Sequence, residues 1–483
     1  MFGNITPEMI LAILPEILMV ILVLLVMVLD LVYREERGRS LGWWTAGGLA
    51  AIFVVTLLVA RPGDDSVELW GGMVRHDWLG FTFTLLFIFG AAITSMFAME
   101  IKQVGNRGEF YLLLLVSTIG MSFMAISADL IMLYLAIETT SIPLYILAGF
   151  LKTDKKSTES GFKYMLFGAM TSAIMLYGFS LLFGFAGTTN IYELSQGFMA
   201  GNLPQGLIIG VLLLVLVGFG FKISMVPFHF WAPDVYEGAP TPVAGYLSTA
   251  SKAAGFAVLM RVLIAAFPMV APAWVMIFAV VSVASMTLGN AIALAQKNIK
   301  RLLAYSSIAH AGYVLIGIAT VSVLGTTASI FYLVVYVITN LAAFGIVAAF
   351  SRVSGSDEIS DYAALSRRSP WLGLAMLITF LSLAGMPPFG GFVAKVFVFA
   401  AAVQSNMVWL AIVGVLNAIV GLYYYLIVLK VVYLYRSEDE DKPVPVTRPY
   451  VLALGILIIG IILAGTIFGP LYFWSDTATA ALF

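Results

Sequence analysis

The feature that most constrains this chain is a succession of long apolar segments separated by short polar ones. An α-helix needs about 20 mainly apolar residues to cross the hydrocarbon core of a bilayer. Hydrophobic residues make up 61% of the 483 positions and charged residues only 11%, against about 25% charged residues in soluble domains. The sequence therefore predicts an all-α polytopic membrane protein. About fourteen transmembrane helices are expected, over residues 9–33, 40–60, 79–99, 110–128, 129–151, 163–186, 205–227, 243–267, 273–295, 302–320, 327–350, 372–399, 406–435 and 449–472.

The composition also excludes several classes of function. The chain has no cysteine, so it has no disulfides and no thiolate ligands for iron–sulfur clusters or metals. It has no GxGxxG or Walker-type phosphate loop, and its net charge of −1 provides no basic surface for nucleic acid. We therefore expect no redox cofactor, nucleotide or metal site on this chain.

The distribution of lysine and arginine tests the number of spans. Seventeen of these residues fall in odd-numbered connections and only two in even-numbered ones. Cytoplasmic loops carry the excess of positive charge, so we expect the odd connections in the cytoplasm and both termini outside. The seventeen are Arg34, Arg37, Arg39, Lys102, Arg107, Lys152, Lys155, Lys156, Lys297, Lys300, Arg301, Arg352, Arg367, Arg368, Arg436, Lys442 and Arg448, and the two are Arg61 and Arg75.

Six basic residues remain, and all of them lie within predicted spans. An ionisable group at mid-membrane costs about 2.5–3.5 kcal/mol on insertion scales and marks a functional site by default. Arg261 and Lys430 lie near span ends, where anchoring at the membrane surface would explain them. The other four are Lys163, Lys222, Lys252 and Lys395.

Lys222 accompanies an expected helix break. A continuous helix over 205–231 would be about 40 Å long, which exceeds a hydrocarbon core of about 30 Å. Pro227 predicts an interruption in this segment, and Lys222 would then lie deep in the protein. The alternative, a lysine that extends to the membrane surface, fits the proline less well.

A second break is predicted in the sequence GMPPFGG. Pro387 and Pro388, together with the glycines, cannot continue a helix, and Lys395 follows them. The two breaks align, SMVPF with GMPPF, which indicates a duplicated transporter core. The two lysines lie on opposite sides of their breaks, so they are not equivalent positions in this alignment.

Lys252 and two further groups, Glu138 and His310, also lie deep inside predicted spans. Glu138 is nine residues from Asp129, about 13 Å into the membrane, and could either pair with a lysine or remain a protonated structural carboxyl. Lys252 lies near mid-depth with no surface to reach. His310 could relay protons or simply fill a packed site.

Other charged residues have equally open interpretations. Lys163 begins span six, one turn after Glu159, so a local i,i+4 ion pair competes with a functional role. Asp234 and Glu237 could accept protons at an entrance or cap the next helix. Glu16 and Asp30 are interpreted as structural.

Several segments resemble one family of membrane proteins. They are FYLLLLVSTIGMSFMAISADLIMLYLAIETTSIPLYILAGF, ESGFKYMLFGAMTSAIMLYG, PFHFWAPDVYEGAPTPVAGYLS, NIKRLLAYSSIAHAGYVLIGI and GMPPFGGFVAKVFVF. Together they are similar to the antiporter-like membrane subunits of respiratory complex I, the proton-translocating NADH–quinone oxidoreductase. The sequence DVYEGAPTPV resembles the subunit N group rather than the related subunits L and M.

The resemblance implies a fold of two inverted five-helix repeats, each with one discontinuous helix. The expected segments are a three-helix flank (1–109), two repeats (110–267 and 268–435), and a loop with the last transmembrane helix (436–483). It also implies a central axis of charged residues for proton translocation. The positions that match this axis are Glu138, Lys163, Lys222, Lys252, His310 and Lys395.

The resemblance further implies an assembly. Flavin mononucleotide, iron–sulfur clusters and quinone are expected on partner subunits, and neighbours are expected to include related antiporter-like subunits and lipids, but no nucleic acid. A bacterial plasma membrane is the expected location. The alternatives are a subunit of a multisubunit cation/proton antiporter, and a scaffold that only anchors its neighbours. The number of intramembrane charges argues against the scaffold.

Overall fold

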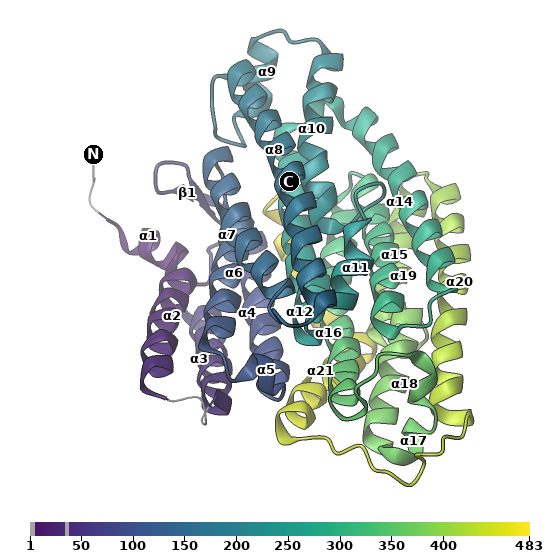
Figure 1. Ribbon diagram of the computed structural model, residues 1–483. Coiled ribbons are helices and arrows are strands. Elements are labelled where there is room, and N and C mark those ends of the chain that lie inside the picture. The colour runs from purple at the N-terminus through teal and green to yellow at the C-terminus, as the bar shows by residue number, and fades with distance from the viewer. Residues whose placement is uncertain (1–4, 34–37) are drawn as a thin grey trace.

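The computed structural model describes residues 5–33 and 38–483. Figure 1 shows a bundle of helices, and 79% of the structure is helical. Within the described residues, thirteen helices are long and apolar enough to cross a membrane, and two shorter apolar helices, Pro370–Ala384 and Gly390–Gln404, together supply a fourteenth span. The prediction of an all-α polytopic membrane protein with about fourteen spans is therefore confirmed.

The helices and strands follow one another along the chain with short connections. The first part contains α1 (Pro7–Ala12), α2 (Leu14–Val32), α3 (Gly38–Val59), β1 (Val67–Leu69), β2 (Val74–His76), α4 (Trp78–Ala98) and α5 (Lys102–Gly105). The second contains α6 (Gly108–Ile126), α7 (Leu130–Ala148), α8 (Lys155–Ala186), α9 (Leu194–Ala200), α10 (Gln205–Ile223), α11 (Trp231–Gly238), α12 (Thr241–Tyr246), the π-helical turn η2 (Leu247–Ser251) and α13 (Lys252–Ala266).

The second half of the chain has a similar organisation. It contains η3 (Pro268–Val270), α14 (Ala271–Ala293), α15 (Ile299–Ala319), α16 (Val323–Ser354), η4 (Ile359–Tyr362), α17 (Leu365–Arg368), α18 (Pro370–Ala384), α19 (Gly390–Gln404), α20 (Val408–Leu434), α21 (Arg448–Thr466) and α22 (Gly469–Ala480). The strands β1 and β2 form one antiparallel hairpin, with Val67 opposite His76 and Leu69 opposite Val74.

Two spans are interrupted by non-helical segments. Pro227 lies between α10 and α11, and Pro387 and Pro388 lie between α18 and α19. The first helix of each pair ends at a left-handed C-cap, Ser224 with φ +57° and Gly385 with φ +86°. A left-handed residue closes a helix by turning the chain away from its axis. These two residues occupy equivalent positions when SMVPF is aligned with GMPPF, so the two breaks share one backbone design.

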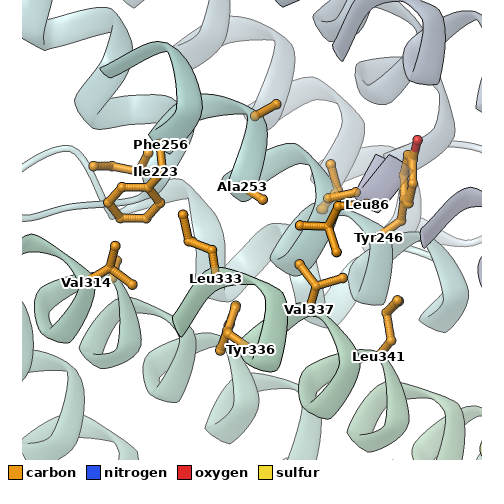
Figure 2. Close-up of a cluster of buried hydrophobic side chains, with 14 of the residues drawn as sticks. Leu86, Ile223, Tyr246, Ala253, Phe256, Val314, Leu333, Tyr336, Val337 and Leu341 are labelled. Carbon is orange, nitrogen blue, oxygen red and sulfur yellow. The ribbon is translucent and has the colours of Figure 1, made fainter. Parts of the chain in front are cut away.

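The long helix α16 lies at the centre of the bundle. Figure 2 shows Leu333, Val337 and Leu341 of this helix facing Leu86 of α4 and side chains of α10, α12 and α13. All of these side chains are almost completely buried. Helices such as α2, α8 and α20 instead expose many apolar side chains at the periphery, as expected where lipid or neighbouring chains cover the surface.

Ion pairs join the odd-numbered connections at one end of the bundle, which we call the basic face. Arg39 and Arg352 both contact Glu100, Lys156 contacts Glu237, and Lys300 contacts Asp357. Arg352 also donates a hydrogen bond to the Pro445 carbonyl in the last of these connections. The expected grouping of these connections agrees with the contacts, while Arg34 and Arg37 lie outside the described residues.

The first even-numbered connections meet at the other end, which we call the opposite face. Asn190 donates a hydrogen bond to Glu68, and β-bridges join Val74 to Ser127 and Asp129 to Asn190. The helix α6 begins at the basic face and α14 at the opposite face, so the two five-helix segments have inverted orientations.

Single cysteines at Lys155 and Thr188 are expected to react from opposite sides of the membrane. Lys155 begins α8 at the basic face, and Thr188 follows the end of the same helix. The native chain contributes no cysteine background, so a membrane-impermeant maleimide gives a direct measurement in intact cells and inverted vesicles. Labelling of both positions from one side would contradict the fourteen-span topology.

Candidate functional site

Lys252 begins α13 directly after the wide turn η2. Its side chain is 1% exposed. The Lys252 ammonium donates hydrogen bonds to the carbonyl of Ser307, at 2.9 Å, and to the hydroxyl of the same residue. Single π-helical turns within helices occur frequently at functional sites. The geometry ties this lysine to α15, the helix that also carries His310.

His310 is held between two tyrosine hydroxyls. Its Nδ1 lies 2.7 Å from the hydroxyl of Tyr332 and its Nε2 lies 3.4 Å from that of Tyr425. Both ring nitrogens therefore have partners, and the hydroxyls can donate to or accept from the imidazole according to its tautomer. A small cavity of about 10 Å³ lies beside the ring, lined also by Thr339 and Ser382, which is roughly the room that one water needs.

Lys395 extends from α19 back to the end of α18, across the helix break. Its ammonium donates to the carbonyls of Leu383 and Ala384, at 3.0 and 2.8 Å. It also lies 5.0 Å from the ring centroid of Tyr313. Gly385 makes this approach possible, because a Cβ there would lie 2.7 Å from the lysine Cδ. The lysine thus satisfies carbonyls that the break leaves without helical partners.

Lys252 and Lys395 share a feature that bears on proton transfer. Each ammonium makes two hydrogen bonds to protein acceptors, whereas a charged lysine has three N–H donors. A neutral amine retains two N–H groups, so both contacts can persist after one proton leaves. No carboxylate forms an ion pair with either lysine among the described residues, and an uncompensated charge in the membrane is costly.

Three residues of α15 connect these two lysines. Ser307, His310 and Tyr313 are spaced three apart and so lie along one face of the helix. Ser307 contacts Lys252 at one end and Tyr313 contacts Lys395 at the other. We call Lys252, Ser307, His310, Tyr313 and Lys395 the buried row.

Glu138 of α7 and Lys222 of α10 precede Lys252 in the first five-helix segment, and they do not contact each other. Ser172 of α8 donates a hydrogen bond to the Glu138 carboxylate, and Lys222 donates to the hydroxyl of Ser141. Ser141 lies one turn beyond Glu138 on α7. Serine hydroxyls therefore hold the carboxylate and the lysine, and the described residues contain no ion pair between them. A Cβ on Gly255 of α13 would lie 3.1 Å from the Cβ of Lys222, so α10 and α13 pack closely beside Lys252.

Lys163 lies elsewhere, in an ionic cluster near the basic face. Its ammonium contacts Glu159 at 2.7 Å and Asp234 at 2.6 Å. Arg301 contacts both Asp234 and Glu237 at 2.8 Å. The local i,i+4 pair between Lys163 and Glu159, which the sequence suggested as an alternative to a functional role, is therefore present. No described contact joins Lys163 to the buried row. A cavity of about 1050 Å³ lies next to this cluster and is lined by Glu237 among others.

The ionic cluster keeps both of its α11 carboxylates charged. Burial raises the pKa of Asp234, but hydrogen bonds from Lys163 and Arg301 outweigh it and hold the pKa below its ordinary value. The pKa of Glu237 is lowered in the same way, against burial, by Lys156 and Arg301. Because these folded-state pKa values are depressed, the pairs contribute stability at neutral pH and lose it as the pH falls below about 4. Neither carboxylate caps α12, which begins after Pro240 without a side-chain cap.

Arg261 differs from the expected surface anchor. Its guanidinium is 1% exposed and forms two hydrogen bonds to the Asp77 carboxylate, at 2.6 and 2.9 Å. It also donates to the carbonyl of Ala125, at 2.7 Å, and to the hydroxyl of Tyr192. Asp77 in turn caps α4 by accepting from the amide of Gly80. This buried pair joins α13 to the hairpin, α6 and the connection before α9.

Sequence reasoning missed the hydroxyl partners of the charged residues. Ser141 and Ser307 carried a detectable signal, because each lies three residues from Glu138 or His310 on the same helix face. Tyr332 and Tyr425 carried none, since they are 22 and 115 residues away from His310.

Two broken helices and a buried row of ionisable residues define the class of antiporter-like membrane subunits. Residues 127–421 match the family described as NADH:quinone oxidoreductase/Mrp antiporter, transmembrane. The chain belongs to this family, and its relatives place it in the subunit N group of NADH–quinone oxidoreductases.

Those relatives align over nearly their whole lengths. The NADH-quinone oxidoreductase subunit N of Moorella thermoacetica is 42% identical over 457 residues, with 94% of this chain and 95% of the relative covered. The NAD(P)H-quinone oxidoreductase subunit 2 of Trichormus variabilis is 37% identical, with 97% and 92% covered.

Solved structures show the same fold. A chain of respiratory complex I from Thermus thermophilus superposes with a TM-score of 0.78 at 32% identity, covering 95% of this chain and 98% of that one. A chain of the Mrp complex from Dietzia reaches a TM-score of 0.82, with 99% and 98% covered. The Mrp chain is only 21% identical, so it supports the fold alone.

Proposed function

We propose that this chain is a membrane-arm subunit of an NADH–quinone oxidoreductase and translocates protons across the membrane. The observation that carries the proposal is the buried row, in which two lysines lie at either side of His310 without a counter-ion in the part of the chain that the structure describes. Electron transfer from NADH to quinone in partner subunits supplies the energy, since this chain has no cysteine for iron–sulfur ligation. Relatives named as subunits of NADH–quinone oxidoreductases support the assignment.

The proton path begins at the basic face and ends at the opposite face. A proton reaches Lys222, passes through Lys252 and His310 to Lys395, and is released on the opposite face. Lys252 and Lys395 can each carry the proton because an amine that has lost one proton still has two N–H groups for its two hydrogen bonds to carbonyl or hydroxyl oxygens. Movement of one proton against 100 mV requires about 2.3 kcal/mol, so a change in the partner subunits must drive each step.

Glu138 supplies the switch for the first step in this proposal. A carboxylate that approaches Lys222 stabilises the charged ammonium, and one that withdraws favours release of the proton. In the described state the Glu138 carboxylate accepts from Ser172 and the Lys222 ammonium donates to Ser141, so the proposed approach requires a movement of at least one charged side chain. Lys163 then acts at the basic face within the ionic cluster, where it sets the local field rather than carrying the proton inward.

The surroundings of the chain follow from the same proposal. Flavin, iron–sulfur clusters and quinone belong to partner subunits, and the exposed apolar faces of α7 and α8 contact lipid or related antiporter-like subunits. We place the basic face in the cytoplasm and both termini on the periplasmic side of a bacterial plasma membrane. We also retain the division into a flank (1–109), two repeats (110–267 and 268–435) and a C-terminal segment (436–483).

A multisubunit cation/proton antiporter is the alternative function. Its subunits share the fold, as the Mrp structure illustrates, so the fold cannot separate the two functions. Affinity purification of the tagged chain from its native membrane does separate them. We expect iron–sulfur and quinone-site subunits to copurify, and a complex without redox subunits would favour the antiporter.

The Glu138→Gln variant is expected to assemble but to lose most NADH-driven proton uptake into inverted vesicles. Glutamine preserves the size of the side chain and its bond with Ser172 but cannot change charge beside Lys222. The matched control is Ser172→Ala, which removes that bond and keeps the carboxylate, and it should retain more uptake. Normal uptake by the fully assembled glutamine variant would remove Glu138 from the mechanism.

A further inference from the structure

A second buried carboxyl lies outside the buried row, in the N-terminal helices. Glu16 is the third residue of α2 and is 2% exposed. Ser122 of α6 donates a hydrogen bond to its Oε1, and the Ser122 hydroxyl lies 2.8 Å from that of Thr84 on α4. The other carboxylate oxygen, Oε2, is buried without a hydrogen-bond partner. The helices α2, α4 and α6 thus converge on one carboxyl group, and one of its oxygens has no hydrogen-bond partner among the described residues.

The chemistry of this site requires a bound proton. Among the described residues no lysine, arginine or histidine forms an ion pair with Glu16, and an ionised carboxylate alone in an apolar interior is strongly disfavoured. The surrounding hydroxyls of Ser122 and Thr84 are neutral. A carboxylic acid is therefore the form that the site can hold at rest, and it carries one proton that the buried row does not include.

Glu16 lies close to the opposite face. Ala12, one turn earlier along the chain, packs with Val74 of β2 and Ile126 at the end of α6. The indole of Trp70 donates to the carbonyl of Met9, at 2.9 Å, and so fixes α1 against the hairpin. About one helical turn therefore separates Glu16 from this face, and the side chains that pack there are apolar.

Polar side chains also lead from Glu16 inward along α6. Thr118 lies one turn before Ser122, and its hydroxyl is 2.6 Å from that of Tyr246 on α12. Two residues further along the chain, Ser248 accepts a hydrogen bond from the amide of Asn340, at 2.8 Å.

The last contacts reach the buried row. Asn340 also donates to the hydroxyl of Tyr336, at 3.0 Å, and the Tyr336 ring lies 5.1 Å from that of His310. The Oδ1 atom of Asn340 is buried without a partner. Hydroxyls and one amide thus extend from His310 to Glu16, and three steps lack a direct hydrogen bond. These steps are Ser122 to Thr118 on α6, Tyr246 of α12 to Ser248 of η2, and Tyr336 to His310, whose rings are in contact.

We infer that Glu16 is an exchangeable proton site at the end of a second release route, which branches from the buried row at His310. This inference rests on the proposed proton translocation. The Glu16 O–H bond breaks as its proton passes to water at the opposite face. As a proton arrives at Ser122 by way of Thr118, the Ser122 hydroxyl passes its own proton to the carboxylate in the same step. One proton leaves for each that arrives.

The test compares Glu16→Gln with Glu16→Asp in the intact complex. Protons taken up into inverted vesicles are measured per NADH oxidised, after assembly is checked. Glutamine keeps the size and the Ser122 hydrogen bond, so a merely structural acid predicts an unchanged ratio. We expect glutamine to lower the ratio with electron transfer preserved, aspartate to restore part of it, and Ser122→Ala to lower it as well. Thr45→Val, a buried hydroxyl of α3 that bonds only within its own helix, is the control and should change nothing.

Two outcomes of the uptake measurements, and one of infrared spectroscopy, would overturn the inference. A wild-type ratio in both Glu16→Gln and Ser122→Ala, with uptake lost in Lys252→Ala, would reject the Glu16 route and leave the proposed function standing. Full uptake in Lys252→Ala would reject both. Infrared difference spectra provide a separate readout, because a carboxylic acid C=O band that is absent from Glu16→Gln should change during turnover in the wild type. If this C=O band stays constant during turnover, Glu16 keeps its proton and has only a structural role.

Discussion

Replacing Lys395 with alanine is expected to abolish NADH-driven proton uptake into inverted vesicles. The change removes the carrier between His310 and the opposite face. It also leaves the carbonyls of Leu383 and Ala384 without their donor, and each unsatisfied buried group costs about 1–3 kcal/mol. Assembly must therefore be measured first, and uptake normalised to the amount of intact complex.

Lys395→Arg separates a proton carrier from a fixed charge. Arginine can still donate to the two carbonyls, but a guanidinium does not lose its proton in proteins. We expect arginine to fail as alanine does, because both lack a group that titrates. Full uptake by the arginine variant would mean that a permanent positive charge at the break is sufficient. Lys430→Ala, a lysine on the exposed side of α20, is the matched control and should retain normal uptake.

The Arg261→Met variant is expected to show the largest loss of stability. Methionine fills much of the volume but removes the cation that forms two hydrogen bonds to the buried Asp77 carboxylate. Breaking a buried ion pair costs about 3–5 kcal/mol, and the remaining contact of Asp77 with Arg75, at 3.3 Å, lowers that cost. The Ala125 carbonyl and the Tyr192 hydroxyl lose a donor as well. Lower subunit content in the membrane and a lower thermal denaturation temperature of the purified complex are the expected measurements.

A double variant tests the cause of that loss. Asp77→Asn keeps an oxygen that can accept from the Gly80 amide but removes the negative charge. Arg261→Met combined with Asp77→Asn should therefore be more stable than Arg261→Met alone. Equal instability would show that packing or the lost donors, rather than an unpaired charge, dominates. The exposed Arg61 offers a control, since Arg61→Met should change stability by no more than about 0.5 kcal/mol.

The sequence was sufficient for the spans and the breaks because both depend on local properties. Apolar length determines whether a helix crosses a bilayer, and the prolines at 227, 387 and 388 prevent helix continuation wherever the chain places them. The excess of lysine and arginine at alternate connections likewise requires no knowledge of packing. These features led to the class of protein before any contact was known.

The contacts of the ionisable residues depended on packing that the sequence does not display. Depth in the membrane suggested that Glu138 and Lys222 were partners, yet each binds a serine. Lys163 forms the local pair with Glu159 that the spacing allowed, but it also pairs with Asp234, which is 71 residues away. The acceptors of Lys395 are backbone carbonyls, which every residue possesses and which become available only where a helix ends. The roles of these residues in proton transfer remain predictions for the variants above to test.

The π-helical turn η2 lets the two parts of the eighth span, α12 and α13, present their side chains at different angles within one continuous helix. A turn of this kind contains one residue more than an α-helical turn, and each residue of an α-helix advances the side chain by about 100° around the axis. The direction of Lys252 is therefore out of phase with the residues of α12 by about that angle. Shortening Leu247–Ser251 by one residue would restore the phase and rotate the lysine away from Ser307 without changing any side chain of α13.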